Sequence, residues 1–163
     1  MSELVAYTDG GCRGNPGIGG WGFVLIDPHT SIALERMGGE PATTNNRMEM
    51  QAGIEALSAI KATASAVVVR TDSQYLIKCC TQWMSGWKAR GWRRKDGPLA
   101  NIELLQQLDE LQSCLRVRWE WVRGHAGHPG NEHADRLTNL AMDQLARGHD
   151  PRSERRFTWT ADR

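Results

Sequence analysis

Four acidic residues stand where they could meet and hold a divalent cation. Asp9 ends a short apolar run and precedes two glycines, and Asp72 follows the apolar run 66–71. Both would lie at the carboxyl ends of strands, where sheets of α/β proteins bind ligands. Glu49 and Asp135 lie near the starts of two expected helices that could close over those ends. Such carboxylates would repel one another without a cation, and oxygen ligands suit Mg²⁺ or Mn²⁺.

Each acid also has an ordinary structural explanation. Asp9 could belong to an Asp-Gly turn, and Glu49 lies three residues after Asn46, the spacing of a helix capping box. Asp72 could cap a helix, and Asp135 could match a helix dipole at the surface. The joint placement of the four acids favours a metal site. Two hard ions about 4 Å apart could activate water and stabilise a leaving oxygen at phosphorus.

A second group of residues suits the binding of a nucleic acid. The segment 83–95 contains no acid and intersperses tryptophans with basic residues, namely Trp83, Trp87, Lys88, Arg90, Trp92, Arg93, Arg94 and Lys95. Flat rings and cations suit the bases, sugars and phosphates of a nucleic acid. The alternative is a solvated helical face above core tryptophans, because positions 83 and 87 share one side of a helix.

Two other patterns are rejected. The stretch 17–22 matches G-x-G-x-x-G, but the apolar run 23–26 that follows indicates a strand, whereas a dinucleotide site needs a helix there. His125, His128 and His133 could suggest zinc, but no cysteine lies close to them in sequence.

The elements expected around these residues define the fold class. Apolar patterning and turn residues predict strands at 4–8, 21–26, 31–37, 66–71 and 115–122, and helices starting near residues 46, 73, 101 and 131. The stretch 9–20 is expected to be a glycine-rich loop. The order of these elements predicts an α/β (α+β) fold with a five-stranded mixed sheet flanked by helices.

Length and composition set limits on the class of protein. The chain has 163 residues, which predicts one catalytic domain over residues 1–147 and a polar, flexible tail over 148–163. The net charge of +1 restricts any attraction for nucleic acid to a local patch. The four cysteines are expected to be reduced. Neither a leader nor a membrane span is expected, so we predict a cytoplasmic protein, with a monomer as the default.

Five segments together resemble the motifs of type 1 ribonucleases H. They are Tyr7–Gly17, Thr43–Glu49, Thr71–Tyr75, Trp119–His128 and Asn131–Asp135. The likeness runs in order from about residue 3 to residue 146. The resemblance implies a ribonuclease H-like fold and an endonuclease that cuts the RNA strand of RNA–DNA hybrids with two Mg²⁺ ions, Mn²⁺ being possible.

The resemblance also implies roles for particular residues. Asp9 would bridge both metals, Glu49 and Asp72 would hold one, and Asp135 would help to hold the other, while His125 would be a mobile catalytic histidine. The products would carry a 5′-phosphate and a 3′-hydroxyl. Substrate contacts would come from the minor-groove residues Gly10, Gly11, Cys12, Gly14, Asn15, Asn45, Asn46, Gln74 and Tyr75, from Thr44 at a DNA phosphate, and from a protruding handle with Trp83, Trp87, Lys88, Arg90, Arg93 and Arg94.

Two other functions remain open at this level. Integrases, transposases and junction resolvases share the sheet order and use similar metal chemistry, so the fold alone does not separate them. A non-enzymatic hybrid-binding module is the other alternative, although all four acids are present.

Overall fold

A twisted mixed sheet forms the centre of the protein. The computed structural model describes residues 3–124 and 127–160. The sheet order is β7-β4-β1-β2-β3-β8, built from β1 (Leu4–Arg13), β2 (Gly17–Asp27), β3 (Ile32–Thr43), β4 (Ala66–Thr71), β7 (Arg116–Trp121) and β8 (Ser153–Thr158). β1, β4 and β7 run parallel, whereas β1, β2, β3 and β8 form antiparallel pairs. The expected fold class is confirmed, with six strands rather than five.

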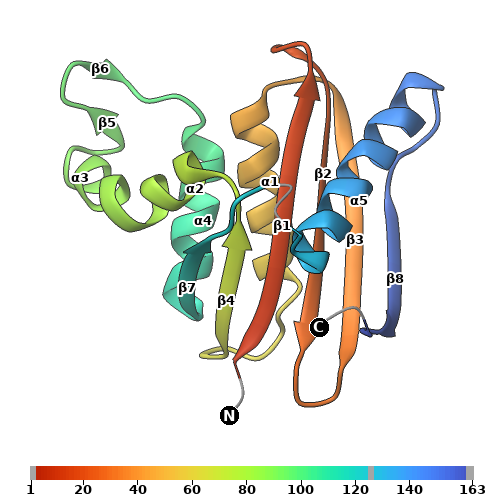
Figure 1. The fold of residues 1–163 in the computed structure, drawn as a ribbon. Coiled ribbons are helices and arrows are strands. Elements are labelled where there is room, and N and C mark those ends of the chain that lie inside the picture. The colour runs from red at the N-terminus through yellow and green to blue at the C-terminus, as the bar shows by residue number, and fades with distance from the viewer. Residues whose placement is uncertain (1–2, 125–126, 161–163) are drawn as a thin grey trace.

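Helices cover both faces of this sheet (Figure 1). α1 (Asn45–Ser58) and α4 (Ile102–Cys114) lie on one face, and α5 (Pro129–Ala146) lies on the other. A protrusion at one end comprises α2 (Gln74–Lys78), the π-helical turn η1 (Cys79–Trp83), α3 (Met84–Ala89) and the short hairpin of β5 (Arg93–Arg94) and β6 (Gly97–Pro98). We call residues 79–98 the handle.

The largest hydrophobic cluster lies between the sheet and α1 with α4. Phe23, Val67 and Val69 from the strands meet Leu57 and Leu105 from the helices. All five side chains are fully buried. Burial of side chains of this size contributes about 1.5–3 kcal/mol each to the free energy of folding. This layer therefore holds the strands, and the side chains on them, in fixed positions.

Helix α5 approaches the opposite face closely because β2 has glycines beneath it. A Cβ atom at Gly20 would lie 2.6 Å from the Thr138 carbonyl oxygen, and one at Gly22 would lie 2.6 Å from Leu137 Cβ. These contacts explain why the glycine-rich stretch is strand and not the expected loop. Because these glycines have no side chains, α5 can rest directly on the paired strands β1 and β2. The turn between the two strands is confined to residues 14–16. The stretch 17–22 opens no helix, which supports the rejection of a dinucleotide site.

The C-terminal segment also differs from expectation. The sequence predicts a flexible tail here, but residues 153–158 form β8, which pairs with β3 from Ile32↔Thr158 to Met37↔Ser153. The strand satisfies backbone groups at the edge of β3 and brings Phe157 against the sheet.

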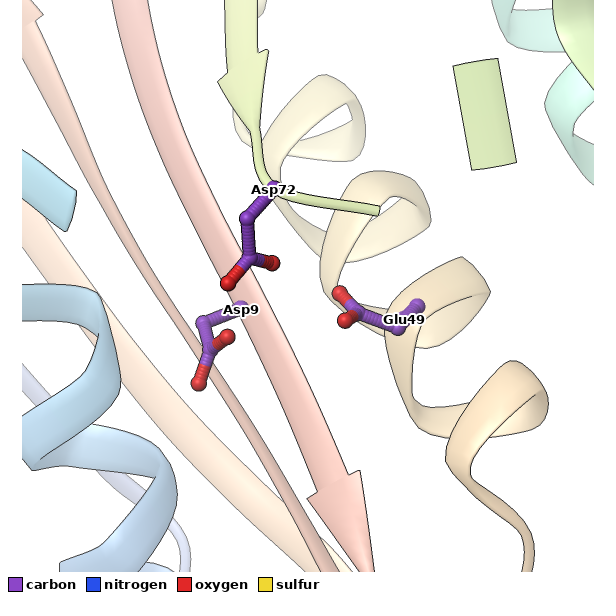
Figure 2. A group of neighbouring side chains, drawn as sticks. All are labelled: Asp9, Glu49 and Asp72. Atoms are coloured by element: carbon purple, nitrogen blue, oxygen red, sulfur yellow. The ribbon is translucent and has the colours of Figure 1, made fainter. Parts of the chain in front are cut away.

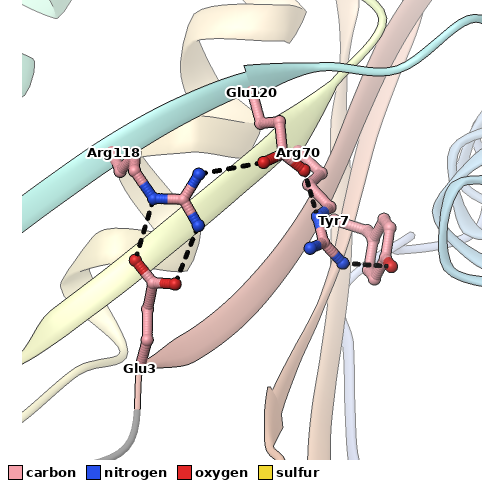
Figure 3. A network of polar contacts seen from close by, with 5 residues as sticks. All are labelled: Glu3, Tyr7, Arg70, Arg118 and Glu120. Carbon is pink, nitrogen blue, oxygen red and sulfur yellow. Dashed lines mark hydrogen bonds and ion pairs between the residues drawn. The ribbon is translucent and has the colours of Figure 1, made fainter.

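An ion-pair network occupies the part of the sheet face near β1, β4 and β7 (Figure 3). Arg118 binds Glu3 at 2.9 Å and Glu120 at 2.9 Å, while Arg70 donates to Glu120 at 2.7 Å and to the Tyr7 hydroxyl at 2.9 Å. Both arginines of this surface are therefore paired with carboxylates. None of the helices among the described residues is long and apolar enough to cross a membrane.

Candidate active site

Asp9 lies in the middle of β1, where the sheet meets both helical layers. The residue is paired with Gly22 and is only 8% exposed. Its backbone carbonyl accepts a hydrogen bond of 3.2 Å from the Thr138 hydroxyl of α5. The structure therefore excludes the interpretation of Asp9 as a turn residue. It places the carboxylate in a fixed part of the sheet.

Glu49 reaches Asp9 because α1 packs directly on the β1 backbone. A Cβ atom at Gly10 would lie 2.3 Å from the Met48 carbonyl carbon, so only glycine permits this approach. The helix begins with Thr44 as its N-cap, whose hydroxyl accepts from the Arg47 N–H at 3.3 Å. Glu49 is therefore not needed for the cap, and its side chain points toward Asp9 (Figure 2).

Asp72 directly follows β4 and completes the group. The N-cap of α2 is Ser73, which accepts from the Leu76 N–H at 3.1 Å, so the capping explanation of Asp72 fails as well. The Trp121 indole donates to the Asp72 carbonyl at 3.2 Å. A Cβ atom at Gly124 would lie 2.8 Å from Asp72 Oδ2, which places Gly124 beside this carboxylate.

The three carboxylates converge on one small volume (Figure 2). Asp9, Glu49 and Asp72 each offer an oxygen, and these oxygens lie within 4.8 Å of one another. Burial, followed by the charge of Asp72, raises the pKa of Asp9 from 3.8 to about 7. Burial, followed by the charges of Asp9 and Asp72, also raises the pKa of Glu49 well above its usual value.

This arrangement fits a hard divalent cation. Glu49 Oε1 is buried and has no hydrogen-bond partner. An orphaned carboxylate oxygen facing two other acids is unfavourable unless a cation or a proton occupies the cluster. An all-oxygen set suits Mg²⁺ or Mn²⁺ better than zinc, and no histidine belongs to this group among the described residues.

Asp135 and His125 are the other two predicted catalytic residues. Asp135 is half-buried in the second turn of α5 and is not among the three converging acids, but its charge contributes to the raised pKa of Asp9. His125 lies outside the described residues. The neighbouring Gly127 has a φ of 77°, a left-handed conformation that glycine adopts without strain.

Comparison with known proteins decides the family. The sequence profile of the RNase H family matches residues 1–143. A ribonuclease H from Cupriavidus necator is 52% identical over 148 residues, which are 90% of this chain and 100% of that protein.

The chain belongs to the ribonuclease H family.

Solved structures agree with this assignment. A type 1 ribonuclease H with the type 2 active-site motif, LC9-RNase H1, superposes with a TM-score of 0.78 at 38% identity, covering 88% of this chain and 74% of that one. LC11-RNase H1, solved in complex with an RNA/DNA hybrid, has a TM-score of 0.68 at 27% identity and covers 88% and 99%. The protein is therefore a ribonuclease H, an endoribonuclease of the class that cleaves the RNA strand of hybrids.

Near the carboxylates, this ribonuclease H brings together two segments predicted to contact the substrate. The Asn15 side chain accepts from the Asn45 N–H at 3.2 Å, which joins the β1–β2 turn to the start of α1. Gly14, Asn15, Asn45 and Asn46 are exposed. The Cys12 thiol instead donates to backbone carbonyls at 3.2 and 3.3 Å, so its side chain is committed to holding this turn.

The handle of this ribonuclease H carries a pocket lined by aromatic rings and cations. Its volume is about 430 Å³, and its lining includes Tyr75, Trp83, Trp87, Arg90, Arg94, Lys95 and Leu99. The Trp83 ring lies 6.0 Å from Tyr75 and 5.8 Å from Trp87, and Trp83 is 38% exposed. Tyr75, predicted as a groove residue, thus forms one wall with the handle tryptophans, whereas Gln74 beside it is exposed.

Two of the predicted handle cations have acidic neighbours. Lys88 lies 3.0 Å from Asp109 of α4, and Arg94 lies 3.0 Å from Asp96. Arg90 and Arg93 are exposed. Lys95, which belongs to the basic segment 83–95 but not to the predicted handle residues, also lines the pocket. Leu99 was not predicted, because its apolar side chain gives no signal for nucleic-acid binding.

Proposed function

We propose that this ribonuclease H cleaves the RNA strand with two Mg²⁺ ions, for which Mn²⁺ can substitute, held by Asp9, Glu49, Asp72 and Asp135. The observation that carries the proposal is the convergence of three carboxylates on one volume with a buried, unpartnered oxygen on Glu49. Ions bound there would supply Lewis acidity at phosphorus and a more acidic water, so that hydrolysis leaves a 5′-phosphate and a 3′-hydroxyl.

The chain's own residues then have separate tasks. Asp9 is central because its carboxylate interacts electrostatically both with Asp72, at the end of β4, and with Asp135, on α5. Glu49 and Asp72 complete one ion site, and Asp135 contributes to the other. His125 would move a proton near neutral pH, for which an imidazole with an ordinary pKa of about 6.5 is suited.

Substrate selection is proposed to depend on two surfaces. The Gly10–Gly14 stretch and the amides of Asn15, Asn45 and Gln74 can hydrogen-bond the 2′-hydroxyls that distinguish RNA from DNA in the minor groove. The handle would grip the DNA strand through phosphate contacts and ring packing. Support comes from the solved complex of LC11-RNase H1 with an RNA/DNA hybrid. We propose that the enzyme acts as a cytoplasmic monomer.

One experiment separates this proposal from its alternatives. End-labelled hybrid, DNA duplex and RNA duplex are incubated with the protein in Mg²⁺, in Mn²⁺ and in EDTA, and the ends of the products are analysed. We expect cutting of the hybrid alone, only with metal, and with 5′-phosphate ends. Cutting of the DNA duplex in preference would favour resolvase-type chemistry, and binding without cutting would indicate a non-enzymatic module.

A further inference from the structure

The C-terminal strand β8 lies beyond the part of the chain that the family profile matches, which ends at residue 143. It continues the sheet from β3 and returns the chain toward the start of α5 (Figure 1). Along β8, Arg155 and Phe157 face the side of the sheet that carries α5, whereas Glu154 and Arg156 face the opposite side. The two faces of one strand thus have different neighbours.

His133 of α5 is enclosed by the inward-facing residues of this segment. Its ring stacks on Phe157 with centroids 5.5 Å apart and planes at 19°, and it meets the edge of Trp159 at 5.6 Å. The Arg155 guanidinium lies 4.3 Å from the centre of the Phe157 ring. The backbone N–H of Trp159 donates to the Ser31 carbonyl at 2.7 Å, which holds the end of the segment in place.

The buried carboxylate of Glu35 connects β3 to both α5 and β8. Glu35 of β3 is 8% exposed, and its Oε1 lies 2.8 Å from His133 Nε2 and 3.1 Å from an Arg155 nitrogen. Phe157 and Trp159 also cover Val24, Ile26 and Ala33, a small hydrophobic cluster separate from the main core. The first turn of α5 therefore rests on an apolar and ionic support built largely by the C-terminal segment.

The position of His133 relates this support to the active site. Two residues later along the same helix stands Asp135, the one predicted metal-binding acid that does not converge with the other three. Asp9, Glu49 and Asp72 come from β1, α1 and the end of β4, which the main core fixes, whereas Asp135 depends on where the first turns of α5 lie. Gly130, at this helix start, also packs closely on the Tyr7 ring.

We propose that β8 with Trp159 is a positioning element for Asp135, acting through its clamp on His133. This inference depends on the proposed role of Asp135 as a metal-binding acid. Loss of the clamp would leave the three-carboxylate cluster intact and would let the first turns of α5 move. The second ion would then be held more weakly, and the hybrid would bind as before, because the predicted substrate surfaces lie elsewhere.

The test compares substitutions on the two faces of β8 in the full-length chain. Phe157→Ala and Trp159→Ala remove the clamp, whereas Trp159→Phe keeps a ring and Arg156→Ala changes only the opposite face. Mn²⁺ binding is measured by calorimetry on the enzyme without substrate. The Mg²⁺ concentration for half-maximal cleavage, kcat, KM and Tm are measured alongside.

We expect the two alanine variants to weaken Mn²⁺ binding and raise the Mg²⁺ requirement by about threefold to tenfold, less than for a group in direct contact with a ligand. KM for the hybrid should not change, and Trp159→Phe and Arg156→Ala should resemble the wild type. In an Asp135→Asn background, Phe157→Ala should add no further loss, because both changes affect one site.

A lower Tm with unchanged metal binding, or losses that add to those of Asp135→Asn, would show that β8 only stabilises the fold and would overturn the inference. If the alanine variants do not fold, His133→Gln tests the same clamp, since its amide can still donate to Glu35 but cannot stack on Phe157. Wild-type enzyme that fails to cut hybrid in Mg²⁺ would instead reject the proposed function, so the two failures are distinguishable.

Discussion

The carboxylate cluster and the handle are built in opposite ways. The cluster lies where two helices press on glycines of paired strands, with Asp9 buried and α1 in contact with the backbone at Gly10. The handle projects from the sheet, and its cations and Trp83 are exposed, whereas Trp87 and Trp92 are half-buried. Negative charges are held close together in the carboxylate cluster, whereas the positive charges of the handle are exposed to solvent. This contrast is the basis for the proposal that the cluster serves the reaction and the handle serves binding.

The strongest test of this division replaces the central acid. Asp9→Asn is expected to abolish cleavage and to leave hybrid binding within about tenfold of the wild type, since phosphate contacts supply most of the affinity. Gel shifts and cleavage assays on one preparation measure both effects, with Glu110→Gln on α4 as a control for loss of an exposed acid. Residual activity near that of the wild type would remove Asp9 from the mechanism.

His125→Ala should have the next largest effect. General acid–base groups contribute about 10²–10⁴-fold, and water can partly replace a mobile imidazole, so we expect kcat to fall by about 10- to 100-fold. Mn²⁺ affinity should be unchanged, as measured by calorimetry. A loss of metal affinity as large as that of Asp9→Asn would mean that His125 is a ligand.

Neutralising the handle should change binding more than chemistry. Replacement of Lys88, Arg90, Arg93 and Arg94 by glutamine should raise KM several-fold with little change in kcat, because these groups hold ground and transition states equally. The salt dependence of binding should flatten by about 0.7–0.9 in log–log slope for each phosphate that the variant no longer neutralises. Arg118→Gln is the matched control, since this cation is already bound by Glu3 and Glu120 (Figure 3).

An unchanged salt slope in the handle variant would show that the cluster of cations is only a solvated face. The ion pairs of Lys88 and Arg94 with Asp109 and Asp96 suggest that Arg90 and Arg93 carry more of the effect. Replacing each of the four cations singly by glutamine would show how much each contributes to the salt dependence of binding.

The same contrast explains which parts of the molecule the sequence could predict. Asp72 can be placed at a strand end because an apolar run followed by polar residues marks that end locally. The same pattern at Asp9 is misleading, since β1 continues through the glycines to Arg13 and Asp9 lies inside the strand, not at its predicted end. The close approach of α1 at Gly10 could not be predicted, since it depends on a contact with Met48 far along the chain. The sequence also leaves capping as an open explanation for Glu49, and the observed N-cap at Thr44 excludes it.

The strand β8 escapes prediction because its signal is weak and long-range. Ser153–Thr158 is polar and rich in arginine, a composition typical of a flexible end. The alternation of Arg155, Phe157 and Trp159 on one side is present in the sequence. Its meaning depends on Glu35 and His133, which lie in distant elements and become neighbours only in the folded sheet.

The smallest expected effects concern stability without metal. The pKa of Asp9 is raised in the folded protein from 3.8 to about 7, so the native state binds more protons than the unfolded chain over that range. In EDTA the free energy of unfolding should therefore fall as pH rises from about 4 to about 7, by on the order of 1–3 kcal/mol. Asp9→Asn should reduce this slope in denaturant titrations at a series of pH values, and the slope that remains should come from Glu49, whose pKa burial also raises. A slope that is the same in the variant would assign it to other groups.

The central claim is that the three converging carboxylates form a metal site that is unfavourable when empty of cation. Its most direct test is the free energy of unfolding of the wild type and Asp9→Asn at about pH 8, each in EDTA and in Mg²⁺. The wild type should gain about 2.7 kcal/mol when free Mg²⁺ is 100 times its Kd, and Asp9→Asn should be more stable than the wild type in EDTA while gaining little from Mg²⁺. A wild type that does not respond to Mg²⁺, together with a variant that is neutral or destabilised in EDTA, would contradict the claim.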